Sequence, residues 1–239
     1  MLAYSYQDTL AYYGVGGAHP GGLSLTKQIF HNENITHTTK ILDAGCGTGQ
    51  TSAYLAEMYK CDVTALDIHP VMIEKAKKRF KERDLPINTI QSSVENIPVS
   101  DQTYDYIISE SVTVFTNIEK TLTEYFRVLK KGGILINIDM TAEGPLHSSD
   151  ITMISNVYGI SYVLTENEWI SLLREVGYRK VNVLHSDSLS SHINKSLEQP
   201  EFHISPSIDP KLMEILQNHQ NVTSLLANKI GYRIFKSKR

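Results

Sequence analysis

The ten residues ILDAGCGTGQ, at positions 41–50, constrain the fold of this chain more than any other segment. Two apolar residues lead into Asp43, and glycines follow at positions 45, 47 and 49. Glycines allow a sharp backbone turn and the close approach of a neighbouring group. The helical pattern of TGQTSAYLAEMY begins within this turn. The segment therefore predicts a strand, a tight turn and a helix.

Strand and helix patterns alternate from residue 40 to residue 140. The expected strands are KILDAG, CDVTALD, INTIQSS, YDYIISES and GILINIDM. A helix is expected between most of these strands. The third of these helices is NIEKTLTEYFRVLKK, which is expected to end at Gly132 and Gly133. Such alternation is typical of a parallel sheet with helices on both faces. We predict an α/β, Rossmann-like doubly wound sheet, mostly parallel with an antiparallel final strand.

The chain is expected to form one domain with three parts. Residues 1–37 would be an N-terminal lid or helical extension, 38–140 the core, and 141–239 insertions with a C-terminal helix and strands. A helix is expected at TENEWISLLREVG, where Thr165 and Glu168 form a capping-box pattern and Gly177 ends the helix. Residues 141–165 show no clear hydrophobic period. The segments 141–165 and 187–208 are either lids or disordered loops, and the sequence does not decide between these alternatives.

The glycine spacing indicates which ligand the turn holds. It is G-x-G-x-G, whereas a nicotinamide dinucleotide favours G-x-G-x-x-G, and Gln50 stands where a phosphate-binding loop requires lysine. Asp43 would repel a pyrophosphate but suits a positively charged ligand. Asp67 ends the second expected strand, where it can accept hydrogen bonds from ribose hydroxyls. A ligand with a ribose, a positive charge and no phosphate is S-adenosyl-L-methionine.

Three motifs, in order, resemble the class I S-adenosylmethionine-dependent methyltransferases: DAGCGTG, LDIHPVMIEKAKKR and RVLKKGGILIN. The arrangement is most similar to the small-molecule branch, which includes quinone-biosynthesis methyltransferases, although no particular acceptor is indicated. The resemblance implies that a methyl group moves from S-adenosylmethionine to a small molecule by in-line displacement, leaving S-adenosylhomocysteine.

The resemblance also implies which residues bind the cofactor. Asp43 should act on the methionine ammonium and Asp67 on the ribose, with Ile68 and Met72 against adenine. Ser93 replaces the acid that often reads the adenine amino group, and Val94 follows it. The remaining expected cofactor contacts are Ala44, Gly45, Cys46, Gly47, Gly49, Gln50, Ser109, Glu110, Tyr12 and His19.

Candidates for catalysis are fewer, because a general base is needed only if the acceptor must lose a proton. Glu110 ends the fourth expected strand and is either an active-site acid or a hydrogen-bonding support. The Gly-rich stretch YYGVGGAHPGGLSLT would be a lid over the cofactor, or else a flexible connection. His19 and Tyr13 from this stretch, with Glu110, are the catalytic candidates.

Composition excludes several other classes. A net charge of −3 without clustered cations argues against a nucleic-acid substrate. The two cysteines match neither a disulfide framework nor a zinc site, so no metal is expected. A signal peptide and a membrane span are not evident, which predicts a cytoplasmic protein. The oligomeric state stays open.

Two rival functions remain. One is a nicotinamide-dependent oxidoreductase, which the glycine spacing and Asp43 disfavour. The other is a non-catalytic protein of the same fold that senses S-adenosylmethionine or S-adenosylhomocysteine, since cofactor binding alone does not prove turnover.

Overall fold

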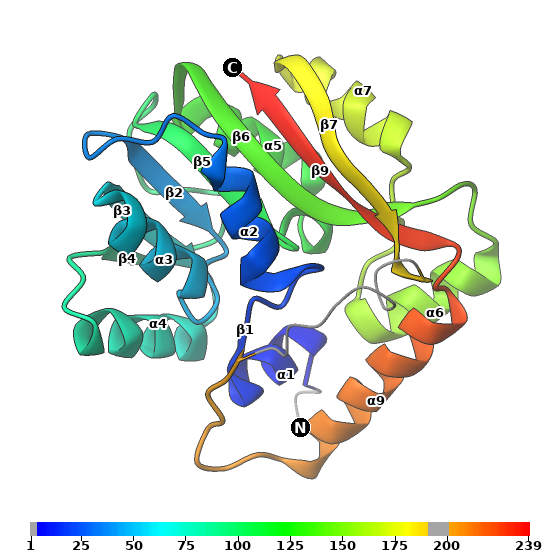
Figure 1. Ribbon diagram of the computed structural model, residues 1–239. Coiled ribbons are helices and arrows are strands. Elements are labelled where there is room, and N and C mark those ends of the chain that lie inside the picture. Colours follow the sequence, from blue (N-terminus) through cyan, green and yellow to red (C-terminus); the bar gives the residue numbers. More distant parts are fainter. Residues whose placement is uncertain (1–3, 191–200) are drawn as a thin grey trace.

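A twisted sheet lies at the centre of the computed structural model, which describes residues 4–190 and 201–239 (Figure 1). Within those residues the sheet has seven strands in the order β4-β3-β2-β5-β6-β9-β7. The strands are β2 (Lys40–Ala44), β3 (Asp62–Asp67), β4 (Asn88–Gln91), β5 (Tyr104–Glu110), β6 (Leu129–Ala142), β7 (Arg179–Ser188) and β9 (Ile230–Lys238).

The strand directions confirm the predicted fold class. Strands β4, β3, β2, β5 and β6 are parallel, whereas β9 is antiparallel to both of its neighbours, β6 and β7. After β4 the chain crosses to the other side of β2 and continues as β5. The strand order therefore reverses between β2 and β5, and parallel sheets bind ligands beyond the carboxyl ends of strands at such a point.

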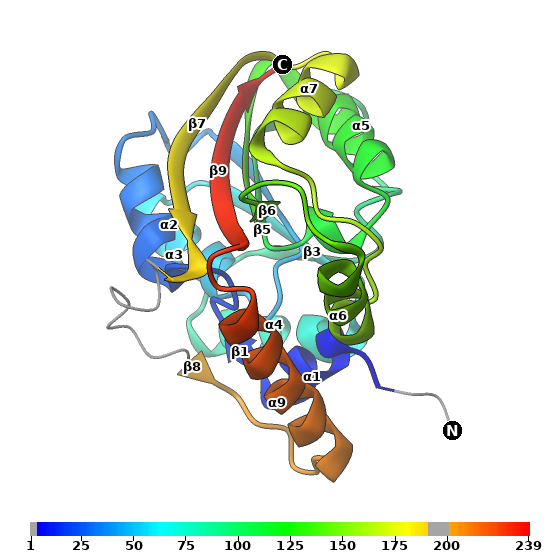
Figure 2. The ribbon, with the colours of Figure 1, turned by 90° about the vertical axis from the view of Figure 1, so that its right-hand side faces the viewer.

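Helices cover both faces of the sheet (Figure 2). The helices that lie wholly within the described residues are α1 (Tyr6–Tyr13), α2 (Gly22–His31), α3 (Gln50–Tyr59), α4 (Pro70–Glu82), α5 (Ile118–Val128), α6 (Ser148–Tyr158), α7 (Glu166–Val176) and α9 (Pro210–Leu225), with the 3-10 turn η1 (Thr113–Phe115). Helices α5 and α7 bury Leu122 and Trp169 against one face, and α2 and α3 bury Phe30 and Leu55 against the other. Helices α1, α6 and α9 pack together through a separate apolar cluster that includes Tyr6, Tyr158 and Val222.

Two short strands join distant parts of the chain. Strand β1 (Val15–Gly16) pairs antiparallel with β8 (Glu201–Phe202). Figure 1 shows this pair beside α1, below the end of β2. The expected lid stretch therefore has a defined backbone, held by a segment almost two hundred residues further along the chain.

The structure corrects several sequence expectations. Helix α1 was not predicted, although Ser5 and Asp8 form a capping box at its start. The region 141–165 contains α6, whose Asp150 receives two hydrogen bonds from Lys229 at 2.9 Å. The segment 187–208 contains β8 and the end of β7, while residues 191–200 lie outside the described residues. No helix in the described ranges is long and apolar enough to cross a membrane.

The third expected helix was predicted to end at Gly132 and Gly133, but α5 ends at Val128 and β6 begins at Leu129. Leu129 is fully buried and pairs with Tyr104 of β5. Lys130 donates to both carboxylate oxygens of Asp105 at 2.9 Å. Pairing with β5 therefore outweighs the helical propensity of these residues.

Candidate active site

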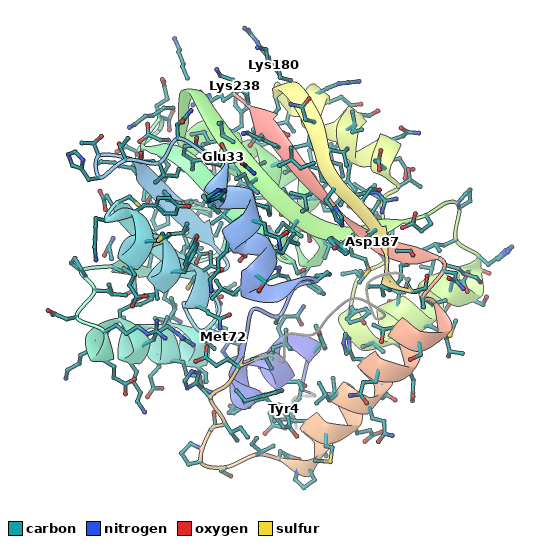
Figure 3. The ribbon with its side chains drawn as sticks, in the orientation of Figure 1. Tyr4, Glu33, Met72, Lys180, Asp187 and Lys238 are labelled. Atoms are coloured by element: carbon teal, nitrogen blue, oxygen red, sulfur yellow. The ribbon has the colours of Figure 1, made fainter. Side chains whose placement is uncertain are left out.

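A cavity of about 320 Å³ opens at the carboxyl ends of β2, β3 and β5, where the strand order reverses. It is bounded by the glycine turn, the start of α4, the turn after β5 and the segment before α2. Figure 3 labels Met72 at the end of α4 that lies beside β1 and α1. The predicted site residues that line the cavity are His19, Asp43, Gly45, Cys46, Gly47, Gln50, Asp67, Ile68, Met72, Ser93, Val94 and Glu110.

Gly45, Gly47 and Gly49 of the turn have positive φ angles of 84°, 52° and 76°, but their surroundings differ. A Cβ on Gly45 would lie 2.3 Å from Val112 Cγ2, and one on Gly49 would lie 2.5 Å from Phe80 Cζ. Only Gly47 faces open space, with the nearest atom, Met72 Sδ, 4.0 Å from its ideal Cβ. Gly47 is therefore the place where a ligand can approach the backbone, while Gly45 and Gly49 permit close packing.

Asp67 ends β3 and lines the cavity. Its Oδ2 accepts a hydrogen bond from Gly47 N at 2.9 Å, and its Oδ1 accepts one from His69 N at 2.8 Å. Burial raises the pKa of this carboxyl group, and the hydrogen bonds from the backbone oppose that rise. Each oxygen keeps a free lone pair, so Asp67 can accept further hydrogen bonds from a ligand.

Asp43 and Glu110 bring two carboxyl groups to the same end of the cavity. Asp43 is 2% exposed and accepts a hydrogen bond of 2.5 Å from Ser52 Oγ. Burial, and next the charge of Glu110, raise the pKa of Asp43 to about 7. Two neighbouring acids in a buried site favour a positively charged ligand, because its charge offsets their mutual repulsion.

Glu110 is held by three elements of the fold. Thr26 of α2 donates to its Oε1 at 2.5 Å, and Thr51 of α3 donates to its Oε2 at 2.6 Å. His19 Nε2 lies 3.4 Å from Oε1. This side chain faces α2 and α3 because β5 alternates its residues between the two faces of the sheet.

The geometry of His19 does not match a free general base. Its Nδ1 donates to the Pro20 carbonyl oxygen at 3.2 Å, and its Nε2 faces Glu110 and Thr26. Both ring nitrogens are therefore engaged within the protein. Tyr13, the other catalytic candidate from this stretch, is not among the residues that line the cavity.

Four further predicted residues also lie off the cavity. Ala44 is fully buried in the core on the α5 side of the sheet, and Gly49 packs against α4. The Ser109 hydroxyl is buried with Thr113 Oγ1 at 3.1 Å and Tyr125 OH at 3.2 Å, on the face opposite Glu110. The Tyr12 and His69 rings are T-shaped with centroids 6.5 Å apart, and Tyr12 does not line the cavity.

Helix α1 contributes residues that the sequence did not indicate. Gln7 and Leu10 line the cavity instead of the two tyrosines. Asp8 accepts a hydrogen bond from His69 Nε2 at 3.1 Å, because His69 Nδ1 already accepts one from Val71 N. The capping pattern at Ser5 and Asp8 could have placed this helix, and the spacing of Gln7 and Leu10 would then have put them on one face.

Apolar side chains make up part of the cavity lining. Leu10, Val15, Val112 and Phe115 are among them, and the Phe115 ring lies 6.2 Å from the ring of the buried Tyr6. Ile68 also borders the cavity and is 66% exposed. Its side chain is therefore available to pack against an apolar group of a ligand.

Comparisons with known proteins agree with this geometry. The family model for a methyltransferase domain matches residues 41–133. A protein of Bacillus subtilis, the uncharacterized methyltransferase YodH, is 36% identical over 96% of this chain and 97% of its own.

Solved structures with the same fold include phosphoethanolamine N-methyltransferase 2 of Haemonchus contortus, in complex with S-adenosylmethionine. It matches with a TM-score of 0.73 and 15% identity over 99% of this chain and 60% of its own. The [4+2]-cyclase SpnF matches with a TM-score of 0.70 and 18% identity over 100% of this chain and 97% of its own. At these identities both structures are evidence for the fold alone.

Proposed function

This chain belongs to the class I S-adenosylmethionine-dependent methyltransferases, and from that premise we propose that it methylates a small molecule held against the apolar side chains of its cavity. The observation that carries the proposal is the arrangement around Gly47. Its backbone borders open space, its N–H donates to Asp67, and Asp67, Asp43 and Glu110 all line the same cavity. That arrangement fits a ligand with a ribose and two positive charges.

The residues of the cavity divide by role in this proposal. Asp67 accepts hydrogen bonds from the ribose hydroxyls, and Asp43 and Glu110 balance the ammonium and sulfonium charges. Ile68 and Met72 cover the adenine, and the Ser93 hydroxyl, which accepts from Glu95 N at 3.1 Å, has its proton free to donate. Bound S-adenosylmethionine supplies an electrophilic methyl group and leaves as a neutral thioether.

The chain itself contributes mainly positioning to the reaction. A well-oriented pair of reactants can gain about 7–11 kcal/mol over the same pair free in solution. The turn after β5 is held rigidly for this purpose, since Asp139 Oδ1 accepts from Val114 N at 3.2 Å and Thr113 Oγ1 donates to Asn137 at 2.9 Å. Phe115, on the same turn, then forms one wall for the acceptor.

The apolar lining favours an acceptor with a hydrophobic body. Leu10 and Phe115 would contact that body, and Gln7 and Ser111, which also line the cavity, offer polar groups to its reacting end. We extend the proposal to a largely apolar acceptor, while a quinone-like acceptor remains a prediction from the resemblance alone.

The test has two stages. The purified protein is first titrated calorimetrically with S-adenosylmethionine, S-adenosylhomocysteine and NADH. Binding of the two sulfur compounds but not NADH is expected, and binding of NADH alone would contradict the assignment. In the second stage, protein with methyl-labelled S-adenosylmethionine is incubated with a small-molecule extract of bacterial cells. Label that moves into an extractable apolar product is expected.

The second stage also separates the enzyme from the rival sensor. A sensor would bind both sulfur compounds and transfer no label to any fraction of the extract. The matched control is Asp43→Asn, which keeps the side-chain shape and removes one of the two negative charges. Transfer that persists unchanged in this variant would come from a contaminating enzyme.

A further inference from the structure

Glu201, at the start of β8, makes a bridge to two segments that border the cavity. Its Oε2 accepts hydrogen bonds of 2.8 Å from Arg79 Nη2 and of 2.8 Å from Gln50 Nε2. Its Oε1 accepts a third from Arg79 Nη1 at 3.3 Å. Gln50 is the first residue of α3 and lines the cavity, whereas Arg79 lies on α4 behind the glycine turn.

Arg79 connects the same bridge to the backbone of the glycine turn. Its Nε donates to the Thr48 carbonyl oxygen at 2.8 Å, and the Arg79 side chain is only 5% exposed. Thr48 lies between Gly47, where the ligand approaches, and Gly49, which packs on α4. The guanidinium therefore fixes the turn on one side and Glu201 on the other.

The bridge also explains the glycines of the N-terminal segment. An ideal Cβ on Gly16 would lie 3.2 Å from Glu201 Oε2, and one on Gly17 would lie 2.9 Å from Gln50 Oε1. Gly16 belongs to β1, which pairs with β8, and Gly17 lines the cavity. Side chains at these two positions would displace the ends of Glu201 and Gln50 and so disturb the bridge.

Charge makes this contact stronger than a typical surface pair. Arg79 is buried, and its hydrogen bonds to Glu201 are charge-assisted. If Glu201 is removed, Arg79 keeps its positive charge with only the Thr48 oxygens as partners, and an uncompensated buried charge disturbs its surroundings. The part of the structure that would move in response is the turn that Thr48 belongs to.

We propose that Glu201 is a positioning residue for the cofactor site: through Arg79 and Gln50 it fixes the glycine turn and holds β1 closed over the bound cofactor. This inference rests on the proposed function. It makes a residue from the far C-terminal part of the chain a determinant of how tightly, and for how long, the cofactor is held. Glu201 does not itself line the cavity, so it acts through its partners.

The experiment compares Glu201→Ala with Glu143→Ala, a matched control. Glu143 forms a similar two-point contact with a buried arginine, Arg233, at 3.0 Å and 2.8 Å, and its side chain is 28% exposed against 34% for Glu201. That pair lies away from the cavity. Affinity for S-adenosylhomocysteine is measured by calorimetry, its dissociation rate by stopped flow, and folding by thermal unfolding, all on the full chain.

The expected result is a loss of affinity of about tenfold or more in Glu201→Ala, mostly through faster dissociation, as for loss of a charge-assisted contact. Glu143→Ala should bind within about twofold of the wild type, and because Arg233 keeps Glu166 as a partner at 2.6 Å, its loss of thermal stability should be no larger than that of Glu201→Ala. Glu201→Gln keeps the side-chain volume and one hydrogen-bond acceptor, so it should fold and bind with intermediate affinity.

Two results overturn the inference. Equal affinity for S-adenosylhomocysteine in the wild type and in both Glu201 variants would show that the bridge does not act on the site. An equal loss of affinity in Glu201→Ala and Glu143→Ala would show that Glu201 affects binding only through the general stability of the fold. A wild-type protein that binds neither S-adenosylhomocysteine nor S-adenosylmethionine would instead refute the proposed function, and the inference with it.

Discussion

Ser52 of α3 donates a hydrogen bond of 2.5 Å to Asp43 of β2, and it joins the first helix after the glycine turn to the strand before it. Asp43 is almost completely buried beside Glu110, and burial is the main reason that its pKa is raised to about 7. The free protein therefore holds a carboxyl group that is only partly ionised near neutral pH. A positively charged ligand would complete its ionisation.

The first prediction is that cofactor binding releases a proton from Asp43. The bound cation favours the ionised carboxylate, so the pKa falls on binding and affinity for S-adenosylmethionine should rise with pH up to about 7. Above that pH the affinity should level off. Calorimetry between pH 5.5 and 8.5 in buffers of different ionisation enthalpy measures both effects. Asp43→Asn should bind weakly with no such pH dependence, and an unchanged pH profile in that variant would assign the proton to another group.

The second prediction concerns folding stability. Burial raises the pKa of Asp139, like that of Asp43, to about 7, and Asp139 Oδ2 has no hydrogen-bond partner among the described residues. In the unfolded chain both groups return to about 3.8. Between these values the folded state holds more protons, so the free energy of unfolding should fall as pH rises from about 4 to about 7.

Urea unfolding at pH 5 and pH 8 checks the second prediction. Asp139→Asn stays uncharged, so it should lose less stability than the wild type between the two pH values. The exposed Asp62→Asn is the control and should follow the wild type. A wild-type protein that is more stable at pH 8 than at pH 5 would show that other groups dominate.

The third prediction is that Asp67→Ala weakens binding of S-adenosylmethionine and S-adenosylhomocysteine alike, by about 1–3 kcal/mol, because charge-assisted hydrogen bonds are lost. Asp67 also orients Gly47 N, so the loss should not depend on the sulfonium charge. Asp62→Ala, at the exposed start of the same strand, is the control and should bind normally. Full affinity in Asp67→Ala would refute the placement of the ribose.

Local pattern was enough to predict the sheet and to identify most of the predicted cofactor residues that line the cavity. The glycine turn, Asp67 and the start of α4 lie within about thirty residues of one another, so their spacing carries the geometry. The alternation of Asp43 and Ala44 along β2, or of Ser109 and Glu110 along β5, could also decide which side chains reach the cavity. Both Ser109 and Glu110 are nevertheless expected at the site, although adjacent residues of a strand face opposite sides of the sheet.

The remainder of the site depends on contacts between distant segments. Glu201 meets Arg79 across 122 residues and Gln50 across 151, and Thr26 meets Glu110 across 84. The local periodicity of a sequence carries no information about contacts between residues so far apart in the chain. The sequence pattern favours Tyr12 and Tyr13 and gives no indication of Gln7 or Leu10, because it does not predict α1. The orientation of α1 is set by the contact of Asp8 with His69 and by Lys75, which donates to the Ala11 and Tyr12 carbonyls.

The fourth prediction separates a positioning role of His19 from a catalytic one. Both ring nitrogens bond within the protein, so His19→Gln should weaken binding of S-adenosylmethionine several-fold by loosening the segment before α2. The rate of label transfer at saturating cofactor should stay within about twofold of the wild type, because no transition-state contact is removed. A large fall in that rate, with loss of its dependence on pH, would make His19 the general base.

The fifth prediction contrasts two glycines of the same turn. Gly47→Ala adds a methyl group in open space at a φ of 52°, so it should cost about 1 kcal/mol of stability while it blocks the approach of the cofactor. Gly49→Ala places its Cβ 2.5 Å from Phe80 Cζ, so overpacking should add about 1–3 kcal/mol to a similar backbone cost. Urea unfolding and titration with S-adenosylhomocysteine measure the two effects separately. Gly49→Ala with Phe80→Leu should recover part of the stability, whereas Gly47→Ala should have no such rescue. If Gly47→Ala binds with normal affinity, the cofactor does not approach the backbone there.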